Sequence, residues 1–224
     1  MNCEPLAGRW SRERRIGELH GEVPPGPRPS ERVLPAVLFV DRVGSTELVI
    51  GAGDGAGRQL LERYYFLVWC QVRQWAGYAL DAAGDGFFAV FRTPVEAIGC
   101  AWSVGAVAER LGVRVRAGVH AGECEVADGA ARGDAVHIGA RIAAFADPGE
   151  VLVSPTAKDL VVGSGLRFEP RGTCTLQGVP GIWPLFAPAR NALVPPSRAA
   201  SAAARHEPMA VATQGGRARL YQEA

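Results

Sequence analysis

The chain of 224 residues contains almost no lysine: of its 24 basic residues only Lys158 is lysine, and the others are arginine. Together with 28 glycines and 16 prolines, this scarcity is typical of the codon bias of a GC-rich genome, and we attach no function to it. The formal net charge is only +1, so the composition does not indicate nucleic-acid binding through an overall basic field.

Long apolar runs are also missing. No stretch of about 18 apolar residues occurs, which is the length that a membrane-spanning helix requires. The first residues are interrupted by Glu4, Pro5 and Arg9, a pattern that does not fit a secretory signal. We therefore expect neither a membrane span nor an export signal.

Paired cysteine motifs are absent as well. The five cysteines show no CxxC or CxxH spacing, which argues against a zinc site; they are Cys3, Cys70, Cys100, Cys124 and Cys174. Their odd number, with two of them inside apolar helical patterns, predicts reduced thiols and a cytoplasmic location.

The sequence divides into a central domain and two tails. Residues 1–33 are polar and then rich in proline, which predicts a flexible leader. Residues 188–224 are rich in alanine, arginine and proline, which predicts a disordered tail. The remaining segment, 34–187, has the usual length of one domain, and the hydrophobic content of 48% is sufficient for a core.

Within this segment, short apolar runs alternate with helical patterns. The best-defined helix starts with Thr93 as N-cap, Pro94 at the first position and Glu96 three residues after the cap. The predicted helices are 61–75, 94–111 and 134–145, and the predicted strands are 37–40, 78–80, 87–91, 113–119, 123–126, 151–154, 166–169, 173–177 and 183–186. The order strand, helix, hairpin, helix, strand predicts an α+β, ferredoxin-like sheet with helices packed on one face.

Two aspartates are the strongest candidates for chemistry. Asp41 ends a predicted buried strand, and Asp85 lies in the turn of the predicted hairpin. In a ferredoxin-like sheet these positions can be adjacent, and two close carboxylates favour a divalent cation between them. The following small residues, 43–46, enter a helix whose free N–H groups can hold phosphate oxygens. Taken singly, each feature also fits an ordinary turn or helix cap.

Several motifs, in order along residues 34–187, resemble the class III adenylate/guanylate cyclase catalytic domain, and most closely its actinobacterial members. The motifs are Phe39-Val40-Asp41-Arg42-Val43-Gly44-Ser45-Thr46, Ala83-Gly84-Asp85-Gly86-Phe87, Arg116-Ala117-Gly118-Val119-His120-Ala121-Gly122-Glu123, Val136-His137-Ile138-Gly139-Ala140-Arg141, Gly149-Glu150-Val151-Leu152-Val153-Ser154 and Gln177-Gly178-Val179-Pro180-Gly181.

The resemblance implies a head-to-tail homodimer with active sites at the subunit interface, converting ATP to cyclic AMP and pyrophosphate. Asp41 and Asp85 match the family's metal aspartates, which implies two Mg²⁺ or Mn²⁺ ions per site. The backbone of Val43, Gly44, Ser45 and Thr46 matches the segment that holds the β- and γ-phosphates. Arg141, contributed by the other subunit, matches the arginine that stabilises charge on the transferring phosphate.

Four positions depart from the family pattern. Asp81 stands where adenylate cyclases have a purine-reading lysine; a carboxylate there suits guanine or simply faces water. The partner purine-reading position is Ala130, which has no hydrogen-bonding side chain. His137 replaces the transition-state asparagine, and Gln177 replaces a lysine that contacts phosphate. These changes predict low activity and leave the choice between ATP and GTP open.

The resemblance therefore leaves more than one function open. We expect a cytoplasmic cyclase of low activity in intracellular signalling, with no membrane or nucleic acid as partner. The alternatives are a guanylate cyclase, or a degenerate domain that dimerises, binds nucleotide and regulates a partner protein without turnover. His120 receives no catalytic role, and Arg42 is expected to extend into solvent or to reach phosphate.

Overall fold

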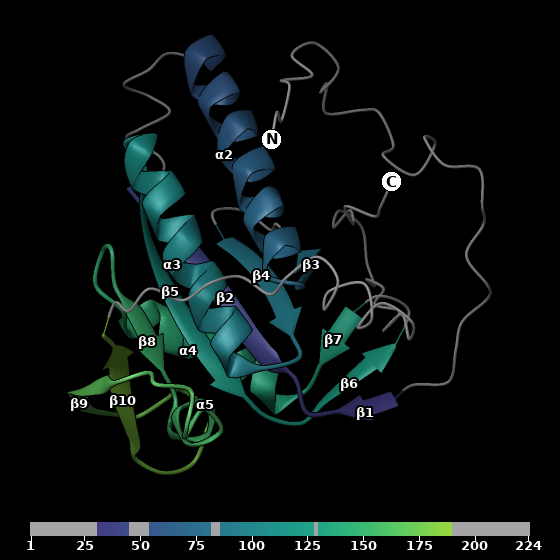
Figure 1. Ribbon diagram of the computed structural model, residues 1–224, viewed down its shortest axis with the longest axis vertical. Helices are drawn as coiled ribbons and strands as arrows, with labels where there is room; N and C mark the ends of the chain where they lie inside the picture. The colour runs from purple at the N-terminus through teal and green to yellow at the C-terminus, as the bar shows by residue number, and fades with distance from the viewer. Residues whose placement is uncertain (1–30, 45–53, 82–85, 128–129, 190–224) are drawn as a thin grey trace.

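The structure, a computed structural model, describes residues 31–44, 54–81, 86–127 and 130–189 (Figure 1). Its helices are α2 (Asp54–Gln74), α3 (Pro94–Arg110), α4 (Asp134–Phe145) and α5 (Pro155–Asp159). Its strands are β1 (Glu31–Val33), β2 (Ala36–Val43), β3 (Tyr78–Asp81), β4 (Gly86–Phe91), β5 (Arg114–Ala121), β6 (Cys124–Ala127), β7 (Ala130–Arg132), β8 (Val151–Val153), β9 (Phe168–Cys174) and β10 (Trp183–Pro188).

A seven-stranded mixed sheet forms the centre of the domain, in the order β3-β4-β2-β5-β8-β10-β9. Only β5 and β8 run parallel; every other neighbouring pair of this sheet is antiparallel. A second, three-stranded sheet has the order β1-β6-β7. The antiparallel β3–β4 pair is the predicted hairpin, and the α+β class predicted from the sequence is confirmed.

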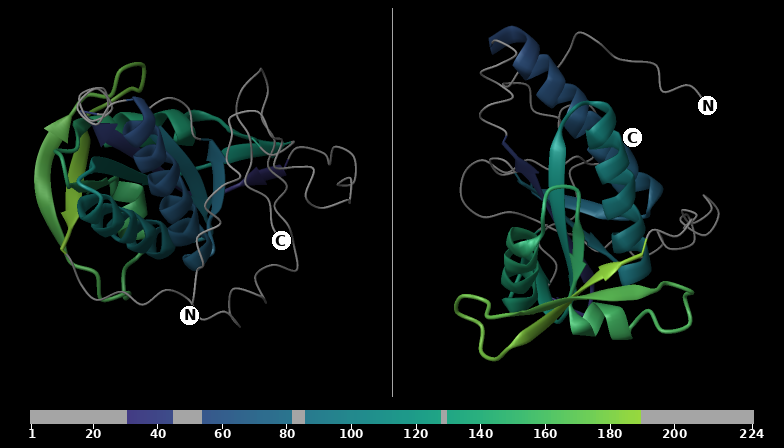
Figure 2. Two further views of the ribbon diagram at one scale, coloured as in Figure 1. Left: turned by 90° about the horizontal axis from the view of Figure 1, so that it is seen from above. Right: turned by 90° about the vertical axis from the view of Figure 1, so that its left-hand side faces the viewer.

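Helices cover both faces of the large sheet, which corrects the prediction that they pack on one face (Figure 2). Leu38 and Val40 of β2 belong to the core shared with α2 and α3. Val37 and Phe39 point the other way, toward α4 at Gly139. The physical reason is visible in the first five residues of β2, 36–40, which are all apolar because this part of the strand is covered on both faces.

The start of α3 follows the predicted capping pattern. The backbone N–H of Glu96 donates to Thr93 Oγ1 at 3.3 Å, and the N–H of Thr93 donates to Glu96 Oε2 at 3.1 Å. Pro94 occupies the first helical turn, where its missing N–H costs nothing. At the other end Gly112, with φ of 71°, adopts the left-handed conformation that stops the helix.

The C-terminal part of the domain differs from the prediction. One continuous strand, β9, replaces the two predicted strands 166–169 and 173–177. Its pairing with β10 shifts register between Pro184 and Phe186, so an irregularity lies inside a continuous ladder. Sequence patterns also did not indicate α5, β1 or β7, which span only three to five residues each. Except for 31–33 and 188–189, the predicted leader and tail lie outside the described residues.

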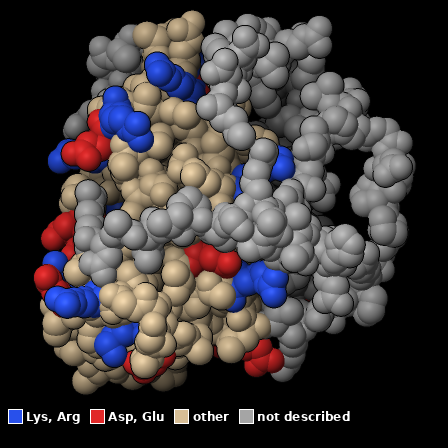
Figure 3. Space-filling view, in the orientation of Figure 1, with Lys and Arg blue, Asp and Glu red and all other residues tan. Residues whose placement is uncertain are grey.

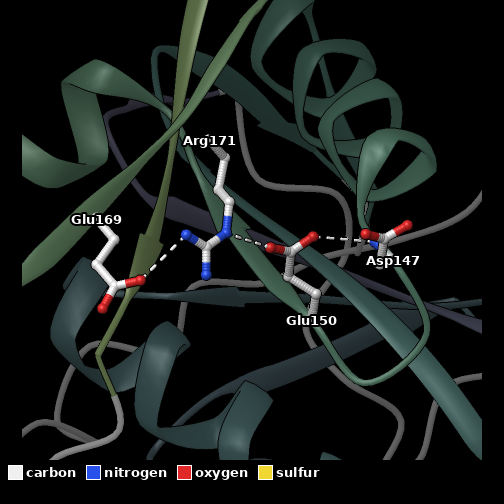
Figure 4. Close-up of polar contacts among 4 residues, drawn as sticks. All are labelled: Asp147, Glu150, Glu169 and Arg171. Carbon is white, nitrogen blue, oxygen red and sulfur yellow. Dashed lines mark hydrogen bonds and ion pairs between the residues drawn. The ribbon is translucent and has the colours of Figure 1, made fainter.

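Charged side chains join β9 to the loop after α4 (Figure 4). Arg171 Nε donates to Glu150 Oε1 at 2.8 Å, and its Nη1 donates to Glu169 Oε2 at 3.1 Å. Glu150 Oε2 in turn accepts the backbone N–H of Asp147 at 3.0 Å. These exposed contacts orient β9 against the end of α4, although each ion pair contributes little free energy by itself.

Candidate functional site

Asp41 lies near the end of β2, on the face of the sheet that α4 covers. Its side chain is 32% exposed, and its carboxylate pairs with Arg116 directly across on β5. Arg116 Nε and Nη2 both donate to Oδ2 of Asp41, at 2.9 and 2.6 Å. The remaining nitrogen, Nη1, donates to the backbone carbonyl of Ala144 in α4 at 2.9 Å. Asp41 is therefore a half-buried carboxylate with one oxygen engaged.

Asp85, the second predicted metal ligand, directly precedes Gly86, the β4 residue that pairs with Asp41. Asp85 itself lies outside the described residues.

The predicted phosphate-binding segment is described only at its start. Val43 ends β2, and Gly44 follows with φ of 71°, in the left-handed region that favours glycine. Ser45 and Thr46 lie outside the described residues. The chain thus turns sharply directly after β2, two to three residues beyond Asp41.

The two predicted purine-reading positions lie on different sheets. Asp81 is the last residue of β3, at one edge of the large sheet, and Ala130 is the first residue of β7 in the small sheet.

His137 and Arg141 lie one turn apart on α4. His137 is exposed and Arg141 is half-buried, and Arg141 Nη1 donates to the carbonyl of His137 at 3.3 Å. A Cβ atom placed on Gly178 would lie 3.7 Å from Arg141 Nη2, so Arg141 is against the turn that contains the exposed Gln177. The structure therefore brings together Arg141, His137 and the Gln177 turn.

Close packing fixes α4 against the sheet. A Cβ atom on Gly118 of β5 would lie 2.3 Å from the backbone nitrogen of Ala143, and one on Gly139 would lie 2.8 Å from Val37 Cγ2. Both glycines therefore allow an approach that a side chain would prevent. Among the described residues, no hydrogen bond joins Asp41 directly to His137 or Arg141; Arg116 instead joins Asp41 to Ala144 of α4.

The two remaining residues singled out from the motifs are buried. His120 is 4% exposed and its Nδ1 lies 2.8 Å from Ser154 Oγ. Arg42 is 7% exposed and stands over the rings of Tyr64 and Tyr65 on α2, with its Cζ atom 5.8 and 5.3 Å from their centroids. The expectation that Arg42 extends into solvent or toward phosphate is wrong, because strand alternation directs it to the opposite face from Asp41.

The residues present fit a divalent ion in chemistry, although the set is incomplete in the described part of the chain. Carboxylate oxygens are the ligands that Mg²⁺ and Mn²⁺ prefer, and Oδ1 of Asp41 accepts no hydrogen bond from a described residue. Within the described ranges no three His, Cys, Asp or Glu side chains gather into a metal site. Asp85 falls in one of the gaps between those ranges.

Arg116 lies in one of the cyclase-like motifs, but the sequence alone did not indicate a role for it. Only the pairing of β2 with β5 places it opposite Asp41, and that pairing joins residues 75 positions apart.

On the face shown in Figure 3, basic and acidic side chains of the described residues are interspersed. No helix in the described part of the chain combines the length and apolar character that a membrane span needs.

No family model matches the chain. A curated protein of Rhizobium meliloti (strain 1021), named "Putative adenylate cyclase 3", is 30% identical over 181 residues, which cover 75% of this chain and 31% of that protein. The chain therefore spans about a third of the length of this relative.

Solved structures show the same architecture. The adenylyl cyclase CyaB of P. aeruginosa superposes with a TM-score of 0.69 at 18% identity, covering 73% of this chain and 97% of that chain. The guanylate cyclase domain of RhGC from Catenaria anguillulae, in complex with GTP, gives 0.64 at 14% identity, with coverage of 71% and 98%. An adenylate/guanylate cyclase/hydrolase of Silicibacter pomeroyi gives 0.62 at 24% identity, with coverage of 73% and 100%.

These likenesses establish the fold predicted from the motifs. The chain has the α+β fold of class III nucleotidyl cyclase catalytic domains. More particularly, it is similar in sequence to one protein named as a putative adenylate cyclase and in structure to several cyclase domains.

Proposed function

We propose that this chain is a member of the class III cyclase family and a metal-dependent purine nucleotidyl cyclase of low activity. It would convert ATP to cyclic AMP and pyrophosphate in intracellular signalling, in the cytoplasm. The observation that carries the proposal is the register that sets Asp41 opposite Gly86, the neighbour of Asp85. A carboxylate on β2, and a second one that directly precedes its β4 partner in the sequence, suit a nucleotide–metal site.

Asp41 and Asp85 would hold two divalent ions, which when bound supply positive charge against the triphosphate and favour ionisation of the ribose 3′-hydroxyl. The 3′-oxygen forms a bond to the α-phosphorus, the α–β phosphoanhydride bond breaks, pyrophosphate leaves with the electron pair, and the hydroxyl proton passes to solvent. The backbone of residues 43–46 would bind the β- and γ-phosphates through its N–H groups.

Arg141 would stabilise charge on the transferring phosphate, with His137 beside it on the same helix. Its guanidinium presents several N–H donors in a plane, which suits phosphate oxygens. As the resemblance of its motif to the cyclase family implies, we assign it to the active site of the partner subunit in a head-to-tail homodimer. Gln177, in the turn beside Arg141, would supply a neutral contact where a cation is expected.

A second candidate function is a regulatory module that binds nucleotide and dimerises without turnover, with a protein partner. Asp81, Ala130, His137 and Gln177 favour it, because each replaces a group that reads the base or stabilises charge. Loss of one such donor typically costs about 10²–10³ in rate. The carboxylate at Asp81 also favours GTP as the substrate of an active form.

The test incubates the purified full chain with Mn²⁺ and either ATP or GTP and measures cyclic nucleotide, with Asp41→Ala as the paired variant. We expect product from one nucleotide and a loss of about 10² or more in the variant. No product from either nucleotide, or equal product from the variant, overturns the enzyme. Thermal stabilisation by nucleotide in an inactive protein would instead support the regulatory module.

A further inference from the structure

The ion pair between Asp41 and Arg116 has a more specific arrangement than a simple neutralising contact. Both hydrogen bonds from the guanidinium end on the same oxygen, Oδ2, at 2.9 and 2.6 Å. The two side chains are 31% and 32% exposed, so the pair is only partly screened by water. Oδ1 accepts no hydrogen bond from the described residues and is the oxygen left for another ligand.

The third nitrogen of the same guanidinium reaches a different element. Arg116 Nη1 donates to the carbonyl of Ala144, in the last turn of α4, at 2.9 Å. Carbonyls in the last turn of a helix have no partner inside the helix and carry the negative end of its dipole. Arg116 thus satisfies the end of α4 and the carboxylate of Asp41 with one planar group.

We infer that Arg116 is a positioning residue for the metal-binding carboxylate: it fixes the orientation of Asp41, leaves Oδ1 for the divalent ion, and lowers the affinity for that ion. This inference rests on the proposed function. A divalent ion bound at Oδ1 would share the Asp41 carboxylate with the guanidinium of Arg116. The positive charge of Arg116 therefore opposes metal binding, while its hydrogen bonds hold the carboxylate in place. A residue with a purely structural role would not have both effects.

The two effects predict opposite changes when Arg116 is altered. Arg116→Gln removes the competing charge, so Mn²⁺ should bind the chain about three- to tenfold more tightly. The same change frees the Asp41 side chain to rotate, so kcat for cyclic nucleotide formation should fall about tenfold or more. Arg116→Lys keeps the charge but cannot make all three contacts, so it should retain the wild-type Mn²⁺ affinity with a lowered kcat.

The experiment titrates Mn²⁺ into the full chain without nucleotide and follows free Mn²⁺ by electron paramagnetic resonance. Arg114→Gln is the matched control, because Arg114 lies two residues away on β5, carries the same charge and is exposed. We expect its Mn²⁺ affinity to change less than about twofold. Asp41→Asn should abolish the site that responds to Arg116.

The outcomes separate the inference from the function on which it rests. If Asp41→Asn leaves Mn²⁺ binding unchanged, Asp41 is no metal ligand, and both the proposed function and this inference fail. If Asp41→Asn removes the site but Arg116→Gln binds Mn²⁺ equally or more weakly, the inference alone is overturned. Should Arg116→Gln not fold, as judged by thermal unfolding, Arg116→Lys decides: a lowered kcat supports the inference and an unchanged kcat overturns it.

Discussion

His120 is a buried imidazole whose surroundings favour the neutral form. Burial lowers its pKa from 6.5 to about 4. Its Nδ1 lies 2.8 Å from Ser154 Oγ and 3.3 Å from Thr156 Oγ1, and the ring of Trp183 packs edge-on at 5.9 Å between centroids. None of these neighbours carries a charge that could stabilise an imidazolium. The residue therefore links β5 to the start of α5 and to β10, and its burial favours the unprotonated form.

This depressed pKa predicts that the fold loses stability in mild acid. The unfolded chain takes up a proton near pH 6.5 and the folded chain only near pH 4, so the contribution of His120 is complete above pH 6.5 and is lost as the pH falls to 4. The expected loss is roughly 3 kcal/mol of unfolding free energy. Urea denaturation at several pH values measures it.

The variant His120→Gln isolates this effect from the carboxylates that also titrate in acid. Its glutamine can still reach Ser154 but does not ionise. As the pH falls from 7 to 4, the wild type should therefore lose more unfolding free energy than the variant. A difference in unfolding free energy between wild type and variant that stays constant over this range would show that His120 does not titrate as described.

At the scale of secondary-structure elements, the site depends on how closely α4 approaches the sheet. Gly118 on β5 leaves space for the backbone of Ala143, and Gly139 on α4 leaves space for Val37. The same contact sets the end of α4 at the distance where Arg116 can reach the Ala144 carbonyl. A side chain in this seam would displace the helix that carries His137 and Arg141.

We therefore predict that Gly118→Ala destabilises the domain and reduces activity together. The new Cβ would lie 2.3 Å from a backbone atom, so the helix must move, at a cost of about 1–3 kcal/mol. Gly105→Ala in α3 is the matched control, because nothing lies within 4 Å of its Cβ position. That change should stabilise the helix by about 0.5–1 kcal/mol. Chemical denaturation with a cyclase assay compares both variants.

At the scale of the whole molecule, the two groups of predicted site residues have different local partners. Asp41 pairs in register with Gly86 and is hydrogen-bonded to Arg116. Arg141 is hydrogen-bonded to His137 and lies beside the turn that contains Gln177. If each active site takes one group from each subunit, a single chain holds two half-sites, and catalysis requires a homodimer.

Mixed dimers test this arrangement. Asp41→Ala and Arg141→Ala should each be nearly inactive alone, but their heterodimer contains one site without either mutation. Random association of equal amounts should therefore restore about a quarter of the wild-type activity. Mixing Asp41→Ala with Asp85→Ala should restore none, because both aspartates come from the same subunit in every site. Restoration in the second mixture, or none in the first, contradicts the head-to-tail dimer.

Much of the fold was predictable from local signals. The Thr93–Glu96 capping box marked the start of α3, and short apolar runs marked β2, β4 and β5, because caps and periodicity act over a few residues. The elements that escaped prediction, such as α5 and β7, are too short to show a period. The only sequence signal for α4 on the second face was the run of apolar residues 36–40 in β2.

The sequence by itself determined the α+β class, the cyclase-like motifs and the identity of Asp41, Asp85 and Arg141 as candidates, because residue type and spacing are properties of the chain. Only the tertiary structure decided that Arg116 lies across from Asp41, that Arg42 turns inward to Tyr64 and Tyr65, and that Arg141 rests against the Gln177 turn. Strand register and helix packing join residues far apart in the sequence, and no local pattern encodes which ones will meet.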